Sequence, residues 1–163
     1  KLIGAFLRLD LPNCKLLIKS TSAKPFELKL PSVEIINGLL SQEDLDEQVH
    51  NVGHCYVNFS NSEGVGMGAI EAAVRNKPVI MPEYGGCTEY VHTPYTIPCR
   101  QCEIGYDDFL FERSMTWGEP DLQVLSKHMQ TVHELKLTYM SHDHTTYTMT
   151  QMLLKRKTLF SSV

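Results

Sequence analysis

Residues 60–72 carry three glycines and two glutamates at the junction between an expected strand and an expected helix. Gly64, Gly66 and Gly68 allow the backbone to approach a ligand closely. The amides around them are then expected to project from the helix N-terminus, which is a favourable place for an anion. A glycine-rich turn before a helix is equally typical of an ordinary loop. The residues around the turn therefore have to decide between the two interpretations.

The two glutamates favour a ligand. At about 100° per residue, Glu71 is expected within an apolar helix stripe, where a carboxylate needs hydrogen-bond partners. The stripe consists of Met67, Ile70 and Val74. A ribose diol offers two adjacent hydroxyls to such a carboxylate. Glu63, before the helix, can accept hydroxyls of a pyranose carried on a diphosphate. The alternative is that neither glutamate binds a ligand. Glu63 then only interacts favourably with the positive end of the helix dipole, and Glu71 pairs with a nearby Lys or Arg.

Composition limits the classes of protein. The chain has 163 residues, 42% of them hydrophobic, which predicts one globular domain over residues 1–163. A net charge of −4 gives no strong attraction to nucleic acid. No apolar run approaches the about 18 residues of a membrane span. The odd number of cysteines favours reduced thiols and a cytoplasmic location; they are Cys14, Cys55, Cys87, Cys99 and Cys102.

The expected elements alternate between strands and helices. Strands are expected at residues 16–18, which are apolar enough for burial on both faces, and at residues 33–36, 55–59, 79–81 and 95–98. Helices are expected at residues 2–9, 67–76, from 122 onward and at 141–160. The helix from 122 is expected to be amphipathic, with one apolar face formed by Leu122, Leu125, Met129 and Val132. Residues 99–118 are expected to be irregular. The pattern predicts an α/β fold, a Rossmann-like parallel sheet with flanking helices, with a C-terminal helical part at residues 119–160.

A further helix has the clearest start signal. Ser41 is the expected N-cap, and acidic residues at 43 and 44 favour the first turn. Leu45, Val49 and Val52 follow at spacings of four and three, which predicts one apolar face.

Residues 63–71, Glu-Gly-Val-Gly-Met-Gly-Ala-Ile-Glu, resemble the Glu-x7-Glu motif of retaining glycosyltransferases with the two-domain GT-B fold, especially the group 1, family 4 type. Ser60 and Ser62 precede the motif. Lys-Pro-Val-Ile at 77–80 and Gly-Gly-Cys-Thr-Glu at 85–89 follow, similar to further stretches of that family in order and spacing. The resemblance covers residues 14–98, and the tail only through its helical character. It implies the C-terminal, donor-binding half of such an enzyme.

The resemblance also implies roles for individual residues. The family's first glutamate, matched by Glu63, is the catalytic-site residue that contacts the donor sugar, and its second, matched by Glu71, binds the ribose. Backbone amides face the sugar and diphosphate; they are matched by Gly64, Val65, Gly66 and Met67. The turn with Gly38 and Leu39 resembles the stretch that borders the nucleobase. Such enzymes transfer a hexosyl group without a metal or other cofactor, because basic groups and helix dipoles stabilise the leaving diphosphate.

The chain departs from the family pattern in three ways. The family's basic pair, which neutralises the diphosphate, would precede Lys1. The nearest basic candidate for a phosphate contact is Lys19, which is otherwise interpreted as an ordinary solvated lysine. Ser-Thr-Ser at 20–22 replaces a glycine-rich turn. The N-terminal domain that binds the glycan, lipid or protein acceptor is missing, and the chain begins within an apolar stretch without Met. We therefore expect a fragment that is inactive alone, from a full-length hexosyltransferase.

Two other functions stay open. Residues 64–69 also fit G-x-G-x-x-A, the dinucleotide fingerprint, with acidic Glu83 about twenty residues on. This is the alternative of an NAD-dependent oxidoreductase domain, although four residues separate the strand from the first glycine. A catalytically inactive nucleotide-binding module has the same sequence features, and only turnover by a full-length chain would distinguish it.

The remaining candidates have ordinary interpretations. Cys99 and Cys102 form one C-x-x-C pair, and His142 and His144 lie some forty residues away, so free thiols are favoured over zinc. His54 and His92 could contact phosphate or acceptor, but a structural role is commoner. Trp117 is expected to pack the tail helices or cover a ligand. The basic run at 155–157 predicts a solvated helix end, with at most peripheral membrane contact.

Overall fold

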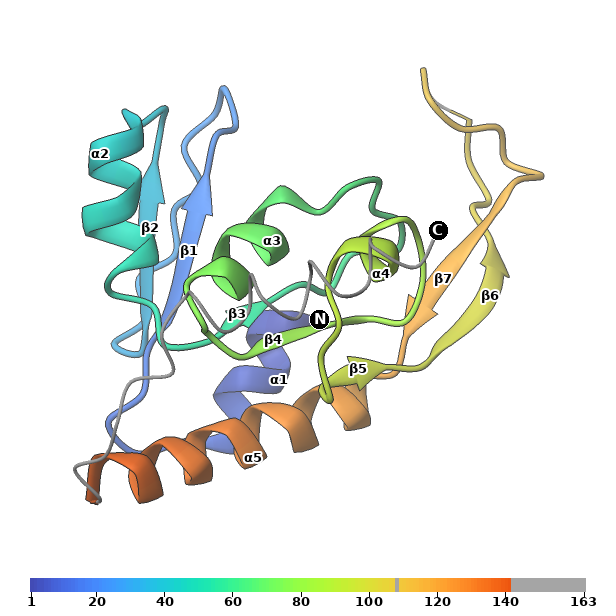
Figure 1. Ribbon diagram of the computed structural model, residues 1–163. Helices are drawn as coiled ribbons and strands as arrows, with labels where there is room; N and C mark the ends of the chain where they lie inside the picture. Colours follow the sequence, from blue (N-terminus) through green and yellow to red (C-terminus); the bar gives the residue numbers. More distant parts are fainter. Residues whose placement is uncertain (108, 142–163) are drawn as a thin grey trace, which may run out of the picture.

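The computed structural model describes residues 1–107 and 109–141, and it is a mixed α/β fold with parallel strands and flanking helices (Figure 1). Strand β1 (Leu16–Ser20) pairs in parallel with β2 (Val33–Asn37). A second parallel sheet has the order β3 (Tyr56–Val57), β4 (Val79–Pro82), β5 (Thr96–Ile97). The expected strands therefore form as two separate parallel sheets, an arrangement compatible with a Rossmann-like fold.

Helices flank these sheets. They are α1 (Leu2–Leu9), α2 (Gln42–Leu45), which continues as the π-helix η1 (Asp46–His50), α3 (Met67–Val74), the short α4 (Cys87–Tyr90) and α5 (Leu122–Ser141). Helix α1 ends at Asp10, which adopts a left-handed conformation with φ 45°. The expected helices at 2–9, 67–76 and from 122 are confirmed, the second being two residues shorter. The helix expected at 141–160 lies outside the described residues, apart from Ser141 at the end of α5.

The N-cap prediction for α2 is confirmed, since Ser41 Oγ accepts a hydrogen bond of 3.1 Å from the amide of Asp44. The predicted apolar face is wrong at Val52, which is 56% exposed because the helix ends at His50. The expectation that β1 is buried on both faces is also wrong. Its residues are half-buried throughout, because its sheet has only two strands.

The core lies on both faces of β4, whose residues are all buried. Ile80 packs toward α1 and α5, where the predicted stripe of α5 is confirmed. Within that stripe Leu125, Met129 and Val132 are buried, and Leu122 is half-buried against the same core. Val79 and Met81 pack toward α3 with Ala69, Ala72, Cys87 and Val91. The two side-chain clusters identify β4 as a central strand between two helical layers.

The expectation that residues 99–118 are irregular is wrong. They contain most of an antiparallel hairpin. Strands β6 (Cys99–Glu103) and β7 (Thr116–Pro120) pair with Cys99 opposite Pro120. The hairpin extends away from the rest of the chain, on the side opposite β1 and β2 (Figure 1). Because β6 is half-buried or exposed along its length, its residues lack the apolar alternation that predicts a strand. No helix in the described ranges is long and apolar enough to cross a membrane.

Candidate functional site

Two glycine-containing turns meet at the carboxyl ends of β3 and β4. The amide of Gly86, after β4, donates a hydrogen bond of 3.0 Å to the carbonyl of Glu63, after β3. A Cβ at Gly86 would lie 2.4 Å from the carbonyl oxygen of Gly64, and one at Gly85 would lie 2.6 Å from that of Glu63. Gly85 also has φ +91°. These positions require glycine because backbone approaches backbone.

The joined turns lead into an uncapped helix. Gly66 is the N-cap of α3, with φ 71°, and it carries no side chain that could cap the first turn. Within residues 1–107 and 109–141, the amides of Val65, Gly66 and Met67 donate no hydrogen bond to a protein acceptor. Free amides and the positive end of the helix dipole are the features that bind an anion.

Glu63 is half-buried beside this turn, close to a tyrosine and a cysteine. Burial raises the pKa of Tyr56, and the charges of Glu63 and Glu71 raise it further. Burial also raises the pKa of the Cys87 thiol, and the negative charge of Glu63 raises it further. A Cβ at Gly68 would lie 2.5 Å from the Tyr56 hydroxyl, so this hydroxyl sits against the first turn of α3. Tyr56 was not among the predicted site residues, because its position in an expected strand predicts only the face of the sheet on which it lies.

The predicted environment of Glu71 is wrong. The buried face of α3 carries Ala69 and Ala72, whereas Met67 is 60% exposed and Val74 38% exposed. Small alanine side chains allow the helix to pack closely on the sheet, so Met67 and Val74 of the expected stripe face outward, while Ile70 is half-buried against the core. Glu71 is consequently half-exposed rather than enclosed in apolar surface, with 28% of its side chain accessible.

The side chain that faces Glu71 is a histidine, not the Lys or Arg of the ligand-free alternative. His50 Nε2 lies 3.1 Å from Glu71 Oε2, and the His50 side chain is 9% exposed. Lys77 Nζ donates to the backbone carbonyl of His50, and Arg75 pairs with Asp46. These contacts hold α3 against η1. Sequence analysis gave no signal for the pair, because its members are brought together only by the packing of two helices.

Lys19 is half-buried and lies against the turn after β2. Its Nζ donates to the carbonyls of Ser20, at 3.3 Å, and of Gly38. Gly38 has φ +91°, and Leu39 beside it is 88% exposed. The structure thus brings together three of the predicted residues at the carboxyl ends of β1 and β2. The predicted residues 63–71 gather separately, after β3 and in α3.

The two candidate histidines lie elsewhere. His54 precedes β3, and His92 lines a cavity of about 230 Å³ beside Lys77 and Pro78, at the amino end of β4. The glycine turns are at the opposite end of that strand.

The other candidates that fall within the described residues do not form a site. Trp117 packs against Tyr106 and Phe111, with ring centroids 6.0 and 6.2 Å away, so it stabilises the hairpin. Cys99 and Cys102 are three residues apart on β6 and project to opposite faces. In the ranges that the structure describes, no group of three His, Cys, Asp or Glu residues could hold a metal. His142, His144 and the basic run at 155–157 lie outside those ranges.

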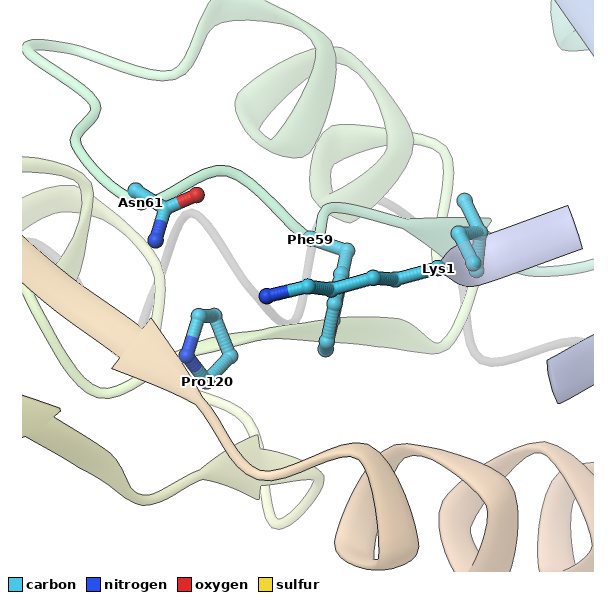
Figure 2. A pocket seen from close by; sticks show the side chains of 5 residues that line it. Lys1, Phe59, Asn61 and Pro120 are labelled. Carbon is cyan, nitrogen blue, oxygen red and sulfur yellow. The ribbon is translucent and has the colours of Figure 1, made fainter. Parts of the chain in front are cut away.

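A cavity of about 370 Å³ lies apart from the glutamates, lined by Lys1, Leu2, Phe59, Asn61 and Pro120 (Figure 2). Phe59 packs toward α1 and α5, so this cavity borders the face of the sheet opposite α3. Figure 2 shows the Lys1 side chain running past Phe59 toward Asn61 and Pro120. Its Nζ bonds Glu119 at 2.6 Å. The uncapped helix with its two glutamates is therefore the better candidate site for an anion.

No family model matches the chain, and no match is found among curated proteins or solved structures.

Proposed function

We propose that the chain is the nucleotide-sugar donor-binding domain of a retaining glycosyltransferase with the GT-B fold. One observation carries the proposal: the joined turns at Glu63 and Gly86 leave the N-terminus of α3 uncapped, with Glu63 before it and Glu71 one turn inside it. Donor amides and two carboxylates within one short segment fit a ligand that combines a diphosphate with hydroxyl groups.

Each group has a task in this proposal. The amides of residues 65–67 and the helix dipole hold the diphosphate and stabilise its charge as it leaves, so that no metal is needed. Glu71 accepts hydrogen bonds from the ribose diol. Glu63 accepts hydroxyls of the hexosyl group that is transferred. The acceptor, a glycan, lipid or protein, would be bound by a further domain.

The dinucleotide alternative fits the geometry less well. Strand β3 ends at Val57, and six residues, 58–63, separate it from Gly64. In the dinucleotide fingerprint the first glycine forms the tight turn directly after the strand. A catalytically inactive nucleotide-binding module would have the same binding site. Only a measurement of turnover by a chain that includes the acceptor domain would distinguish it from a transferase.

A thermal-shift titration tests the proposal. The chain is titrated with UDP, GDP, UDP-glucose, GDP-mannose and NAD, with no metal added. We expect one nucleoside diphosphate and its sugar conjugate to raise the melting temperature, because a ligand that binds only the folded state stabilises it. Stabilisation by NAD alone, or by none of these compounds, would contradict the proposal.

A further inference from the structure

We propose that His50 is a positioning residue for Glu71, and that the pair makes the site prefer ribonucleotides to 2′-deoxyribonucleotides. The inference rests on the proposed nucleotide site and adds a determinant of sugar specificity to it. It depends on the geometry of two side chains that lie on different helices.

The two side chains are placed for this role. His50 Nε2 lies 3.1 Å from Glu71 Oε2, while 28% of the Glu71 side chain remains accessible. Nε2 has no other hydrogen-bond partner in the part of the chain that the structure describes, and its alignment with Oε2 is not yet that of a hydrogen bond. A small rotation of either side chain gives Glu71 a donor on one oxygen and leaves the other carboxylate oxygen for a ligand.

The scaffold around His50 holds it in place. It is the last residue of η1, a π-helical turn, and such turns are frequent at functional sites. Lys77 Nζ donates to the His50 and Gly53 carbonyls, which fixes the backbone at the end of η1. The Arg75 guanidinium pairs with Asp46 on the same face of α3. These contacts fix the backbone that carries the imidazole and leave its Nε2 free to face Glu71.

The chemistry follows from the orientation of a carboxylate. A glutamate side chain has several rotamers, and ordering it on ligand binding costs conformational entropy. A buried imidazole that donates to one carboxylate oxygen selects one orientation before the ligand arrives. With its two lone pairs, the free carboxylate oxygen then accepts both hydroxyls of a ribose diol, whereas a 2′-deoxyribose offers only one. The loss of His50 should weaken the ribonucleotide more than the deoxyribonucleotide.

Four proteins test this inference: the wild-type chain, His50→Leu, His50→Gln and His92→Leu. Calorimetry measures the affinity of each for UDP and dUDP, or for GDP and dGDP if the guanine nucleotide binds. We expect the wild type to prefer the ribonucleotide about tenfold, the effect of one hydrogen bond to a charged group. His50→Leu should remove this preference, mainly by weakening the ribonucleotide. His50→Gln should retain it, because the amide Nε2 replaces the ring donor.

His92→Leu is the matched control, since His92 is an exposed histidine near the other end of β4, and it should leave both affinities unchanged. If His50→Leu does not fold, as judged by its thermal transition, two other variants test the inference. Glu71→Gln should abolish the preference for the ribonucleotide, and His50→Gln should keep it. A preference that survives in His50→Leu, or is absent in the wild type, overturns the inference while nucleotide binding stands. A wild type that binds no nucleotide overturns both.

Discussion

The amide of Gly86 lies 3.0 Å from the carbonyl oxygen of Glu63 and donates a hydrogen bond to it. This single bond joins the turns that follow two adjacent parallel strands, β3 and β4. Ligands of open parallel sheets bind at the carboxyl ends of the strands. The contact therefore fixes the shape of the backbone at the place where we propose that the diphosphate is held.

The joined turns should not tolerate a side chain at Gly86. A Cβ there would lie 2.4 Å from the Gly64 carbonyl oxygen, so Gly86→Ala should lower the free energy of unfolding by about 1–3 kcal/mol, the cost of overpacking. Chemical denaturation measures the change. Gly64→Ala is the control, because a Cβ at Gly64 has no atom within 4 Å and should change stability little. Equal stability of the two variants would show that the turns separate in solution.

Gly68 makes room for the Tyr56 ring. In a free helix, alanine is more stable than glycine by about 1 kcal/mol. A Cβ at Gly68 would nevertheless lie 2.5 Å from the Tyr56 hydroxyl and 2.8 Å from ring carbons. We expect Gly68→Ala to destabilise the wild type but to stabilise a Tyr56→Leu background. Thermal denaturation of the four proteins in this cycle measures the coupling, and additive effects would contradict the contact.

Cys55 should resist alkylation in the folded chain. Burial, with the nearby Cys14 thiol, raises the pKa of Cys55 to about 12. Since the thiolate is the reactive form, iodoacetamide at about pH 8 should modify Cys55 slowly in the native protein and rapidly after denaturation. Mass spectrometry of the modified peptides measures both rates. Equal rates in the two states would mean that the thiol is not buried.

Glu119 should contribute a pH-dependent part of the stability. Hydrogen bonds from Lys1 and Arg100 lower its pKa from 4.5 to about 2. Because the pKa is lower in the folded state, this contribution is present above pH 4.5 and is lost as the pH falls toward 2. The melting temperature of Glu119→Gln should therefore fall less steeply than that of the wild type over this range. Glu34→Gln, on exposed β2 surface, is the control and should follow the wild type.

Sequence patterns predicted the elements whose burial is regular. The stripe of Leu122, Leu125, Met129 and Val132 predicted α5. The continuous apolar run at residues 16–18 predicted the existence of β1 but not its burial, which is only partial. The β6–β7 hairpin was missed because its exposed residues show no alternation. The predicted buried face of α3 was wrong because the prediction followed the spacing of the large side chains. The helix instead packs on the core through the small side chains of Ala69 and Ala72.

The site was predictable only in part. Glycine and glutamate spacing identified residues 63–71 as a candidate segment. The contact between Gly86 and Glu63 depends on how adjacent strands pair, and the approach of His50 to Glu71 depends on how two helices pack. No local sequence pattern predicts either distance, because both depend on tertiary packing.

The central claim is that a nucleoside diphosphate binds at the N-terminus of α3. The most direct measurement is a titration of the ¹⁵N-labelled chain with UDP and with GDP, followed through its glycine amide resonances by NMR. We predict that one of the two nucleotides shifts the resonances of Gly64, Gly66 and Gly68 most strongly, followed by those of Gly85 and Gly86. Shifts confined to Gly105 and Gly118 of the hairpin segment, or no shift with either nucleotide, would contradict the claim.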